Sequence, residues 1–172
     1  MCASLICSCA DSAITMTLAK LTDFATRYAK TWCSQNPDSV AAFFAETGSL
    51  SVNDGPPAVG RAAIAEEAQG FMKTVPDMIV TFDKLECSTS DGGRSSCDAV
   101  FHWTLNGTNT GPGGTGKRVR ISGYELWQIG DDGLIAQSKG HFDSAEYQRQ
   151  LKHGFDVGRG DWPQSPVLLF CG

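Results

Sequence analysis

Apolar residues in the first half of the chain recur with the spacing of helices. From Thr17 onward they return at intervals of three and four residues, which places them on one stripe and predicts a helix. Asp38 or Ser39 is expected to cap a second helix over Ser39–Glu46 (SVAAFFAE). The same spacing predicts a third helix over Ala62–Lys73.

The second half of the chain shows alternating apolar and polar residues, which is typical of strands. Four such strands are expected, at Met78–Glu86, Ala99–Leu105, Lys117–Ile129 and Leu134–Phe142. A shorter strand is expected earlier, over Ser49–Asn53. Turn residues at Asn106-Gly107 and Asp131–Gly133 favour an antiparallel meander among the later strands. Helices followed by antiparallel strands predict an α+β fold.

Length and local composition indicate one folded domain between two weaker segments. The chain has 172 residues, enough for a single core. Residues 1–15 lack the basic start and sustained apolar run of a signal peptide, so we expect a leader outside the fold. Residues 16–152 form the expected domain, and residues 153–172 a tail that begins rich in glycine and charge. The lack of a secretion signal favours a cytoplasmic protein with reduced cysteines.

Charge and residue spacing make several partner classes poor candidates. The net charge is −5, which offers no basic surface for nucleic acid. No apolar stretch approaches the length of a membrane span. The three histidines and seven cysteines lack the spacing of metal ligands. We therefore expect no metal, no cofactor, no nucleic-acid partner and no membrane association.

The glycine-rich segment Gly111–Lys117 (GPGGTGK) fits most of two phosphate-binding patterns. Both patterns need a helix directly after the loop, because the free N–H groups at the start of that helix bind the phosphate. Here the loop precedes a predicted strand, and Arg118 stands where a P-loop requires Ser or Thr. We therefore interpret the segment as a connection between strands.

The order and spacing of several motifs resemble the nuclear transport factor 2-like superfamily, and its SnoaL-like (polyketide cyclase-like) branch in particular. These motifs are the Gly60-Arg61 step, FMKTVPDMIVTFDKL, HWTLNGTNTGPGGTGKRVRISGYELWQIGDDGLI and the closing HFDSAEYQRQL. Together they cover the chain from Leu18 to Leu151. The resemblance implies a cystatin-like cone, in which a curved mixed or antiparallel sheet wraps on N-terminal helices around an apolar pocket. It also implies a homodimer.

Members of this superfamily include polyketide cyclases, ketosteroid isomerase and non-catalytic binding modules, so the pocket must decide the function. In the polyketide cyclases the last strand reads like E-H-W-D, and its aspartate carries the acid–base chemistry. The matching run in this chain is Gln137–Gly140, so Gly140 stands where that carboxylate would be. This departure leaves both an enzyme and a binding module open.

Strand alternation assigns one face of each strand to the expected pocket. Glu125 falls among apolar residues on that face, where a raised pKa would suit a general acid or base. Asn53 is expected to orient or polarise the substrate, and Asp143 is a further catalytic candidate that capping of the last helix would also explain. The other expected pocket residues are Tyr28, Trp32, Ser51, Phe101, Trp103, Ile121, Trp127, Ser138 and Phe142. Alternatively, Glu125 pairs with Arg118, Arg120 or a helix residue and only anchors the sheet.

The expected function is cofactor-independent acid–base chemistry on a small apolar or polycyclic molecule. The candidate reactions are isomerisation, aldol-type cyclisation and hydration, which belong to the isomerase and lyase classes. The alternative is a non-catalytic module that binds a ligand in the cone or a protein partner on the outer sheet.

Overall fold

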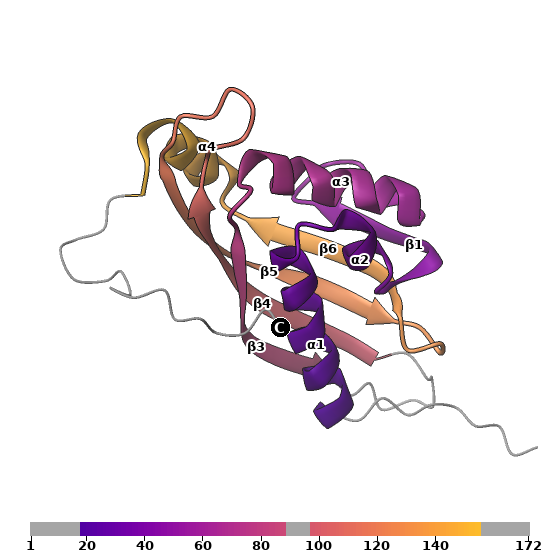
Figure 1. The fold of residues 1–172 in the computed structure, drawn as a ribbon. Coiled ribbons are helices and arrows are strands. Elements are labelled where there is room, and N and C mark those ends of the chain that lie inside the picture. Colours follow the sequence, from indigo (N-terminus) through magenta and orange to yellow (C-terminus); the bar gives the residue numbers. More distant parts are fainter. Residues whose placement is uncertain (1–17, 89–96, 156–172) are drawn as a thin grey trace, which may run out of the picture.

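The structure is a computed structural model that describes residues 18–88 and 97–155. One curved sheet of six strands, in the order β2-β1-β6-β5-β4-β3, carries the helices on its inner side (Figure 1). The elements are α1 (Leu18–Cys33), α2 (Pro37–Ala41), β1 (Phe44–Val52), β2 (Ala58–Val59), α3 (Arg61–Thr74), β3 (Ile79–Ser88), β4 (Cys97–Thr108), β5 (Arg118–Ile129), β6 (Ile135–Phe142) and α4 (Ser144–His153). The predicted leader and residues 156–172 of the predicted tail lie outside the described residues. The mixed sheet and its helices confirm the predicted α+β fold class.

The first two helices follow the apolar pattern of the sequence, with one change at the start of α2. Helix α1 buries Leu21, Phe24 and Tyr28 on the side that faces the sheet. The predicted cap of α2 at Asp38 or Ser39 is wrong, because the side chain of Asn36 accepts hydrogen bonds from both of those backbone N–H groups. Pro37 explains the earlier start, since proline suits the first position of a helix and needs no N–H partner there.

The predicted second helix is wrong beyond Ala41, because Phe44–Val52 forms strand β1. This strand pairs antiparallel with β2 and parallel with β6, and Phe44 lies opposite Ile135 in a fully buried position. Backbone pairing with two neighbouring strands therefore outweighs the helical spacing of the local sequence. The predicted short strand over Ser49–Asn53 is the second half of β1.

Strand β4 continues through Asn106-Gly107, where the sequence predicted a turn. Gly107 pairs with Val119 of β5 and lies against the connection between α3 and β3. A Cβ atom at this position would lie 2.3 Å from Cγ1 of Val75, so no larger residue fits without a shift. Close packing therefore explains this glycine, and the chain turns only after Thr108.

The glycine-rich segment Gly111–Lys117 connects β4 to β5, as predicted. The backbone N–H of Asn109 donates to the carbonyl of Lys117 at 2.8 Å and closes this loop. Strand β5 follows directly, so the loop does not lead into a helix N-terminus. The structure therefore confirms that this segment is a strand connection and not a phosphate-binding loop.

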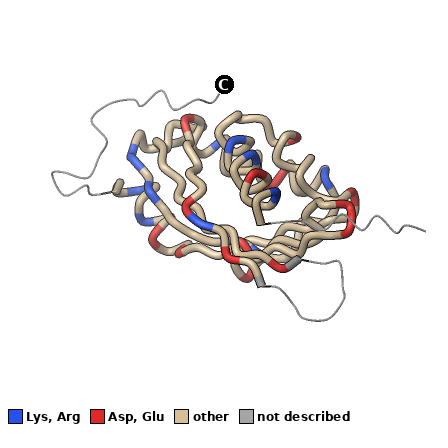
Figure 2. Tube along the Cα trace, turned by 90° about the horizontal axis from the view of Figure 1, so that it is seen from below, with Lys and Arg blue, Asp and Glu red and all other residues tan. Residues whose placement is uncertain are grey.

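The core fills the space between the inner face of the sheet and helices α1–α3. Its largest fully buried side chains are Trp127, Tyr28, Phe44, Phe101, Leu21, Ile64 and Met72. Acidic and basic residues are interspersed along the strands of the curved sheet (Figure 2). Within the described residues, no helix is long and apolar enough to cross a membrane.

We predict that Gly107→Ala lowers the free energy of unfolding by about 1 to 3 kcal/mol, because the added methyl group overpacks the contact with Val75. Urea denaturation of the purified protein would measure this change. The control is Gly70→Ala in α3, where a Cβ atom meets nothing within 4 Å. This control should stabilise the protein by about 0.5 to 1 kcal/mol through helix propensity. Equal effects of the two substitutions would contradict the packing argument.

Candidate functional site

An apolar cavity lies between the inner face of the sheet and the helices. Its lining consists of Trp32, Leu50, Val52, Phe71, Val80, Phe101, Trp103, Leu105, Ile121, Glu125, Gly140, Phe142 and Tyr147. The centres of water molecules could occupy about 50 Å³ of it, and the empty space is about 600 Å³ with its open mouth included. Glu125 is the one carboxyl group in this lining. The site is therefore a narrow, aromatic-rich cavity with a single acidic side chain.

Glu125 lies in the middle of β5, between Phe101 of β4 and Gly140 of β6. Its side chain is buried, with 6% of the residue exposed. The carboxylate oxygen Oε2 accepts hydrogen bonds from Ser138 Oγ at 2.7 Å and Trp127 Nε1 at 2.9 Å. The hydroxyl of Tyr28 lies 3.2 Å from Oε2 and 3.4 Å from Oε1. Oε2 is thus held by three neutral donors, while Oε1 has one long contact.

Burial in these apolar surroundings raises the pKa of Glu125 above its ordinary value. The hydrogen bonds from Trp127, Ser138 and Tyr28 act in the opposite direction and only partly offset the cost of desolvation. Burial, and then the charge of Glu125, also raise the pKa of Tyr28 well above its ordinary value, so its hydroxyl remains a donor. Glu125 can therefore change its protonation state while its neighbours keep theirs.

Glu125 does not pair with Arg118 or Arg120, but the helix partner that the alternative also allowed is present, because the hydroxyl of Tyr28 in α1 donates to its carboxylate. In the part of the chain that the structure describes, the side-chain partners of Glu125 are Tyr28, Trp127 and Ser138, none of which carries a positive charge. The carboxyl group is therefore buried without a counter-ion.

Apart from Ser51, the expected pocket residues fall into two groups around Glu125. Five of them line the cavity directly, namely Trp32, Phe101, Trp103, Ile121 and Phe142. Tyr28, Trp127 and Ser138 lie behind this surface and donate hydrogen bonds to the carboxyl group. Together the two groups surround Glu125 with apolar side chains on the cavity side and with donors on the other.

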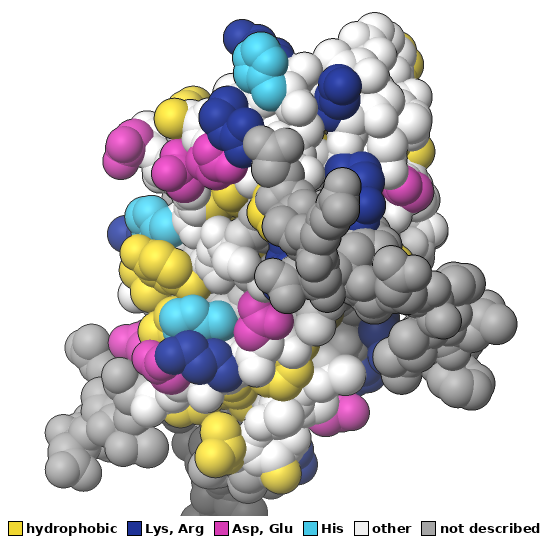
Figure 3. Space-filling model, turned by 90° about the vertical axis from the view of Figure 1, so that its left-hand side faces the viewer, with side chains coloured by type: hydrophobic (Ala, Val, Ile, Leu, Met, Phe, Trp, Pro, Cys, Tyr) yellow, Lys and Arg dark blue, Asp and Glu magenta, His cyan; other side chains and the backbone are white. Residues whose placement is uncertain are grey.

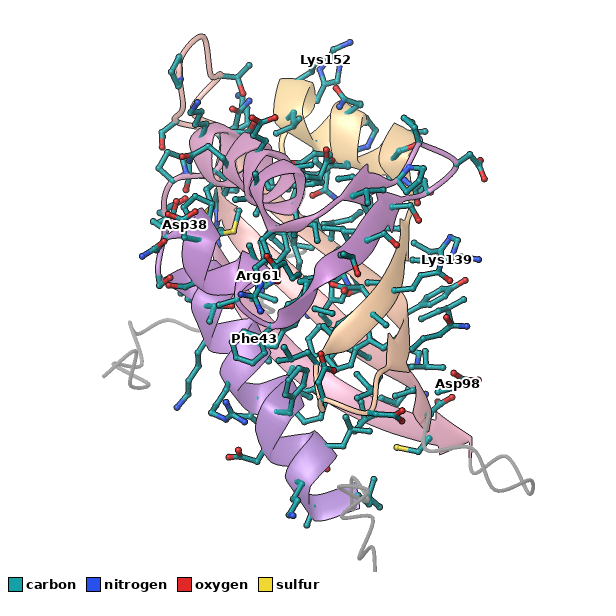
Figure 4. The ribbon with its side chains drawn as sticks, turned by 90° about the vertical axis from the view of Figure 1, so that its right-hand side faces the viewer. Asp38, Phe43, Arg61, Asp98, Lys139 and Lys152 are labelled. Atoms are coloured by element: carbon teal, nitrogen blue, oxygen red, sulfur yellow. The ribbon has the colours of Figure 1, made fainter. Side chains whose placement is uncertain are left out.

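The expected orientation of Ser51 and Asn53 is wrong, because Leu50 and Val52 line the cavity in their place. In the parallel pairing with β6, Ser51 lies opposite Lys139, which points away from the helices (Figure 4). From Ser49 to Val52 the pairing is unbroken and places Leu50 and Val52 beside Ser138 and Gly140. The pairing assumed from the sequence was one residue out of register, and a shift of one residue exchanges the two faces of a strand.

Asn53 and Asp143 have local structural roles that explain them without a substrate. Asn53 adopts a left-handed conformation with φ of 51°, and its Oδ1 accepts a hydrogen bond from the backbone N–H of Phe142 at 2.9 Å. Asp143 is exposed and caps α4, since its Oδ1 accepts from the backbone N–H of Glu146 at 2.9 Å. Neither residue is among those that line the cavity.

Several lining residues were not expected from the sequence, chiefly Leu50, Val52, Phe71, Val80 and Tyr147. Phe71 belongs to the predicted third helix, whose apolar spacing gave no indication of contact with the cavity. Tyr147 belongs to α4, whose position at the cavity depends on the turn after β6. Sequence spacing carries no signal for that position.

The described residues contain no group of three or more His, Cys, Asp or Glu side chains that could hold a metal ion.

The outer face of the sheet carries a row of aromatic side chains from three strands. Tyr124 lies between His102 and His141, with ring centroids 5.9 and 5.1 Å away. Histidine and hydrophobic side chains lie next to one another on this surface (Figure 3). This face is separate from the cavity.

A curved sheet that wraps on helices around an apolar cavity defines the nuclear transport factor 2-like, or ketosteroid isomerase-like, class of fold. The chain belongs to the SnoaL-like polyketide cyclase family, whose model matches residues 22–151. No curated protein matches the chain.

Solved structures show the same fold at low sequence identity. AclR from Streptomyces galilaeus is 16% identical with a TM-score of 0.65, covering 83% of this chain and 87% of its own. A protein with a ketosteroid isomerase-like fold from Catenulispora acidiphila, in complex with trimethylamine, is 16% identical with a TM-score of 0.62 and coverages of 75% and 92%. AusH from Aspergillus nidulans is 16% identical with a TM-score of 0.59 and coverages of 74% and 86%. These similarities establish the fold alone.

We predict that Glu125 makes the protein less stable as the pH rises. Because its pKa is higher in the folded state than the ordinary value of 4.5, the folded protein keeps this proton where the unfolded chain has lost it. This contribution is complete below pH 4.5 and is lost as the pH rises through the folded-state pKa.

Urea denaturation of the wild type and of Glu125→Gln across this pH range would measure the effect. As the pH rises, the unfolding free energy of the wild type should fall relative to that of Glu125→Gln. A difference that stays constant would contradict a raised pKa.

Proposed function

We propose that the protein catalyses cofactor-independent proton transfer on a small, largely apolar molecule, with Glu125 as the acid–base group. One observation carries this proposal: Glu125 is a buried carboxyl group in the lining of an apolar cavity, and no residue that the structure describes gives it a counter-ion. A carboxyl group in such a place has a pKa shifted toward neutrality, where it can accept and return a proton. Isomerisation, aldol-type cyclisation and hydration all need such a step.

The hydrogen bonds of Glu125 support this role. Ser138 and Trp127 both donate to Oε2 and hold the carboxyl plane in one orientation. Oε1 has only the 3.4 Å contact with Tyr28 and keeps free lone pairs for a substrate proton. A base held rigidly with one free oxygen suits repeated proton transfer at one carbon atom.

The position of Glu125 also compensates for the missing carboxylate of the last strand, where this chain has Gly140 in place of the cyclase aspartate. Gly140 lies directly opposite Glu125 in the pairing of β5 with β6. A Cβ atom on Gly140 would lie 3.7 Å from Cγ of Glu125, so the two positions border the same part of the cavity. In our proposal, Glu125 supplies from β5 the carboxylate that the resemblance places on the last strand.

The size of the cavity favours a small substrate over a polycyclic one. Trp32, Phe71 and Phe142 are linked by edge-to-face ring contacts, with centroid distances of 6.2 and 6.1 Å, and they narrow the space. A polycyclic molecule would have to displace these rings from their contacts.

The second candidate is a non-catalytic module that binds a ligand in the same cavity. The observation in its favour is that protein groups alone satisfy Oε2, as they would if Glu125 only anchored the sheet. The two functions differ in what happens to the ligand, since only an enzyme would exchange its protons.

We predict that Glu125→Gln lowers proton transfer by about 100-fold or more while binding persists, because the amide cannot act as a base. The measurement is deuterium incorporation from D₂O into a panel of small cyclic ketones, followed by mass spectrometry. The matched control is Glu67→Gln on the exposed side of α3, which should retain the wild-type rate. Exchange that survives Glu125→Gln, or that never occurs in the wild type, would favour the binding module.

The family resemblance implies a homodimer, and we further propose that its interface is the outer face of the sheet. Leu126 and Tyr124 lie on this face with 40% and 38% of their surfaces exposed.

We predict that Leu126→Glu shifts the protein to a monomer in sedimentation velocity, because the substitution places a charge in the contact between the two copies. Lys30→Glu on the exposed side of α1 is the control and should leave the mass unchanged. A monomeric wild type would contradict this proposal.

A further inference from the structure

Trp103, which lines the cavity, carries a hydrogen-bond donor that has no acceptor among the described residues. Its side chain lines the cavity together with Glu125. The indole Nε1 is buried from solvent and has no hydrogen-bond partner among the described residues. Buried N–H groups are nearly always paired, because leaving one unpaired sacrifices its interaction with water. This donor therefore requires an explanation.

The sheet holds the indole ring of Trp103 on the cavity side. Trp103 of β4 lies opposite Gly123 of β5, and a Cβ atom on Gly123 would come within 2.6 Å of ring atom Cζ2. The glycine thus leaves the space in which the ring lies across the neighbouring strand. The ring of Phe142 contacts it edge to face, at a centroid distance of 6.0 Å. The ring position therefore depends on packing and not on a hydrogen bond of its nitrogen.

The donor of Trp103 and the carboxyl group of Glu125 belong to the same sheet face. Gly123, which lies under the indole ring, is two residues from Glu125 along β5. Residues at this spacing point to the same side and lie about 7 Å apart. Both side chains therefore belong to the same stretch of the cavity wall.

We propose that Trp103 Nε1 donates a hydrogen bond to an oxygen of the ligand, and that the ligand is a small, mostly apolar carbonyl compound. This inference rests on the proposed function, since it places the carbonyl beside the base. Glu125 takes a proton from the carbon next to the carbonyl, and the C–H electron pair forms the C=C bond of an enolate. The carbonyl π pair moves to oxygen, where the Trp103 N–H stabilises the charge. Return of the proton to the same or a conjugated carbon completes the reaction without an oxidant or reductant.

The assignment of Trp103 replaces the role that the sequence suggested for Asn53. The Oδ1 atom of Asn53 is engaged by the backbone of Phe142, and the residue does not line the cavity. Tyr147 of α4 is the lining residue with an O–H donor, which makes Tyr147→Phe a matched control.

The test compares two probes of the same shape, cyclohexanone and methylenecyclohexane, which carry C=O and C=CH₂ at the same position. Kd values for both are measured on the full chain as wild type, Trp103→Phe and Tyr147→Phe. Trp103→Phe should reduce the preference for the ketone about five- to tenfold, the effect of one buried hydrogen bond. Tyr147→Phe should leave the preference unchanged. An unchanged preference in Trp103→Phe, or a loss in Tyr147→Phe alone, would overturn the proposal.

A second measurement keeps the test valid if Trp103→Phe does not fold. In the wild type, the indole ¹H–¹⁵N signal of Trp103 should move downfield with cyclohexanone and not with methylenecyclohexane. The same response to both probes would overturn the proposal, as would a failure of the ketone to bind up to its solubility limit.

Deuterium incorporation into bound cyclohexanone separates this inference from the proposed function. A ketone preference that needs Trp103, without exchange that needs Glu125, supports the donor and contradicts the catalytic proposal. Exchange that needs Glu125, with a preference that ignores Trp103, leaves the enzyme in place and overturns the assignment of the donor.

Discussion

The buried carboxyl group of Glu125 is the constraint on which the rest of the site depends. A charge at the centre of an apolar core is costly unless donors surround it, and here the donors come from α1, β5 and β6. Tyr28, Trp127 and Ser138 must therefore converge on one point, which ties the first helix to the last two strands. The same network leaves one oxygen of Glu125 with free lone pairs, so the interaction that secures the core also prepares a group for chemistry.

Two glycines shape the inner face of the sheet around this carboxyl group. Gly140 lies opposite Glu125 and Gly123 lies opposite Trp103, each where a larger side chain would meet its neighbour. Absent side chains thus create the space in which the carboxyl group and the indole ring face the cavity. In a superfamily with many chemistries, such small changes in the lining decide what one member can bind.

Much of the fold and part of the site could be predicted from local pattern. Glu125 was identified because β5 alternates regularly over its whole length, so its side-chain directions follow from counting. The same counting failed in β1, because the assumed pairing with β6 was one residue out of register, and Leu50 and Val52 lie at the cavity instead of Ser51 and Asn53. Alternation separates the two faces of a strand, but the register with the neighbouring strand decides which face points inward.

The sequence by itself determined the helix stripe of α1, the four later strands, the family resemblance and the acidic residue on the inner face. Each of these depends on spacing along the chain or on the order of motifs. Only the tertiary structure decided that Phe44–Val52 is a strand and that Glu125 has three neutral donors, with no counter-ion in the described part of the chain. It also decided that the indole N–H of Trp103 has no acceptor there. These features arise from contacts between segments far apart in the chain, and local periodicity carries no information about such contacts.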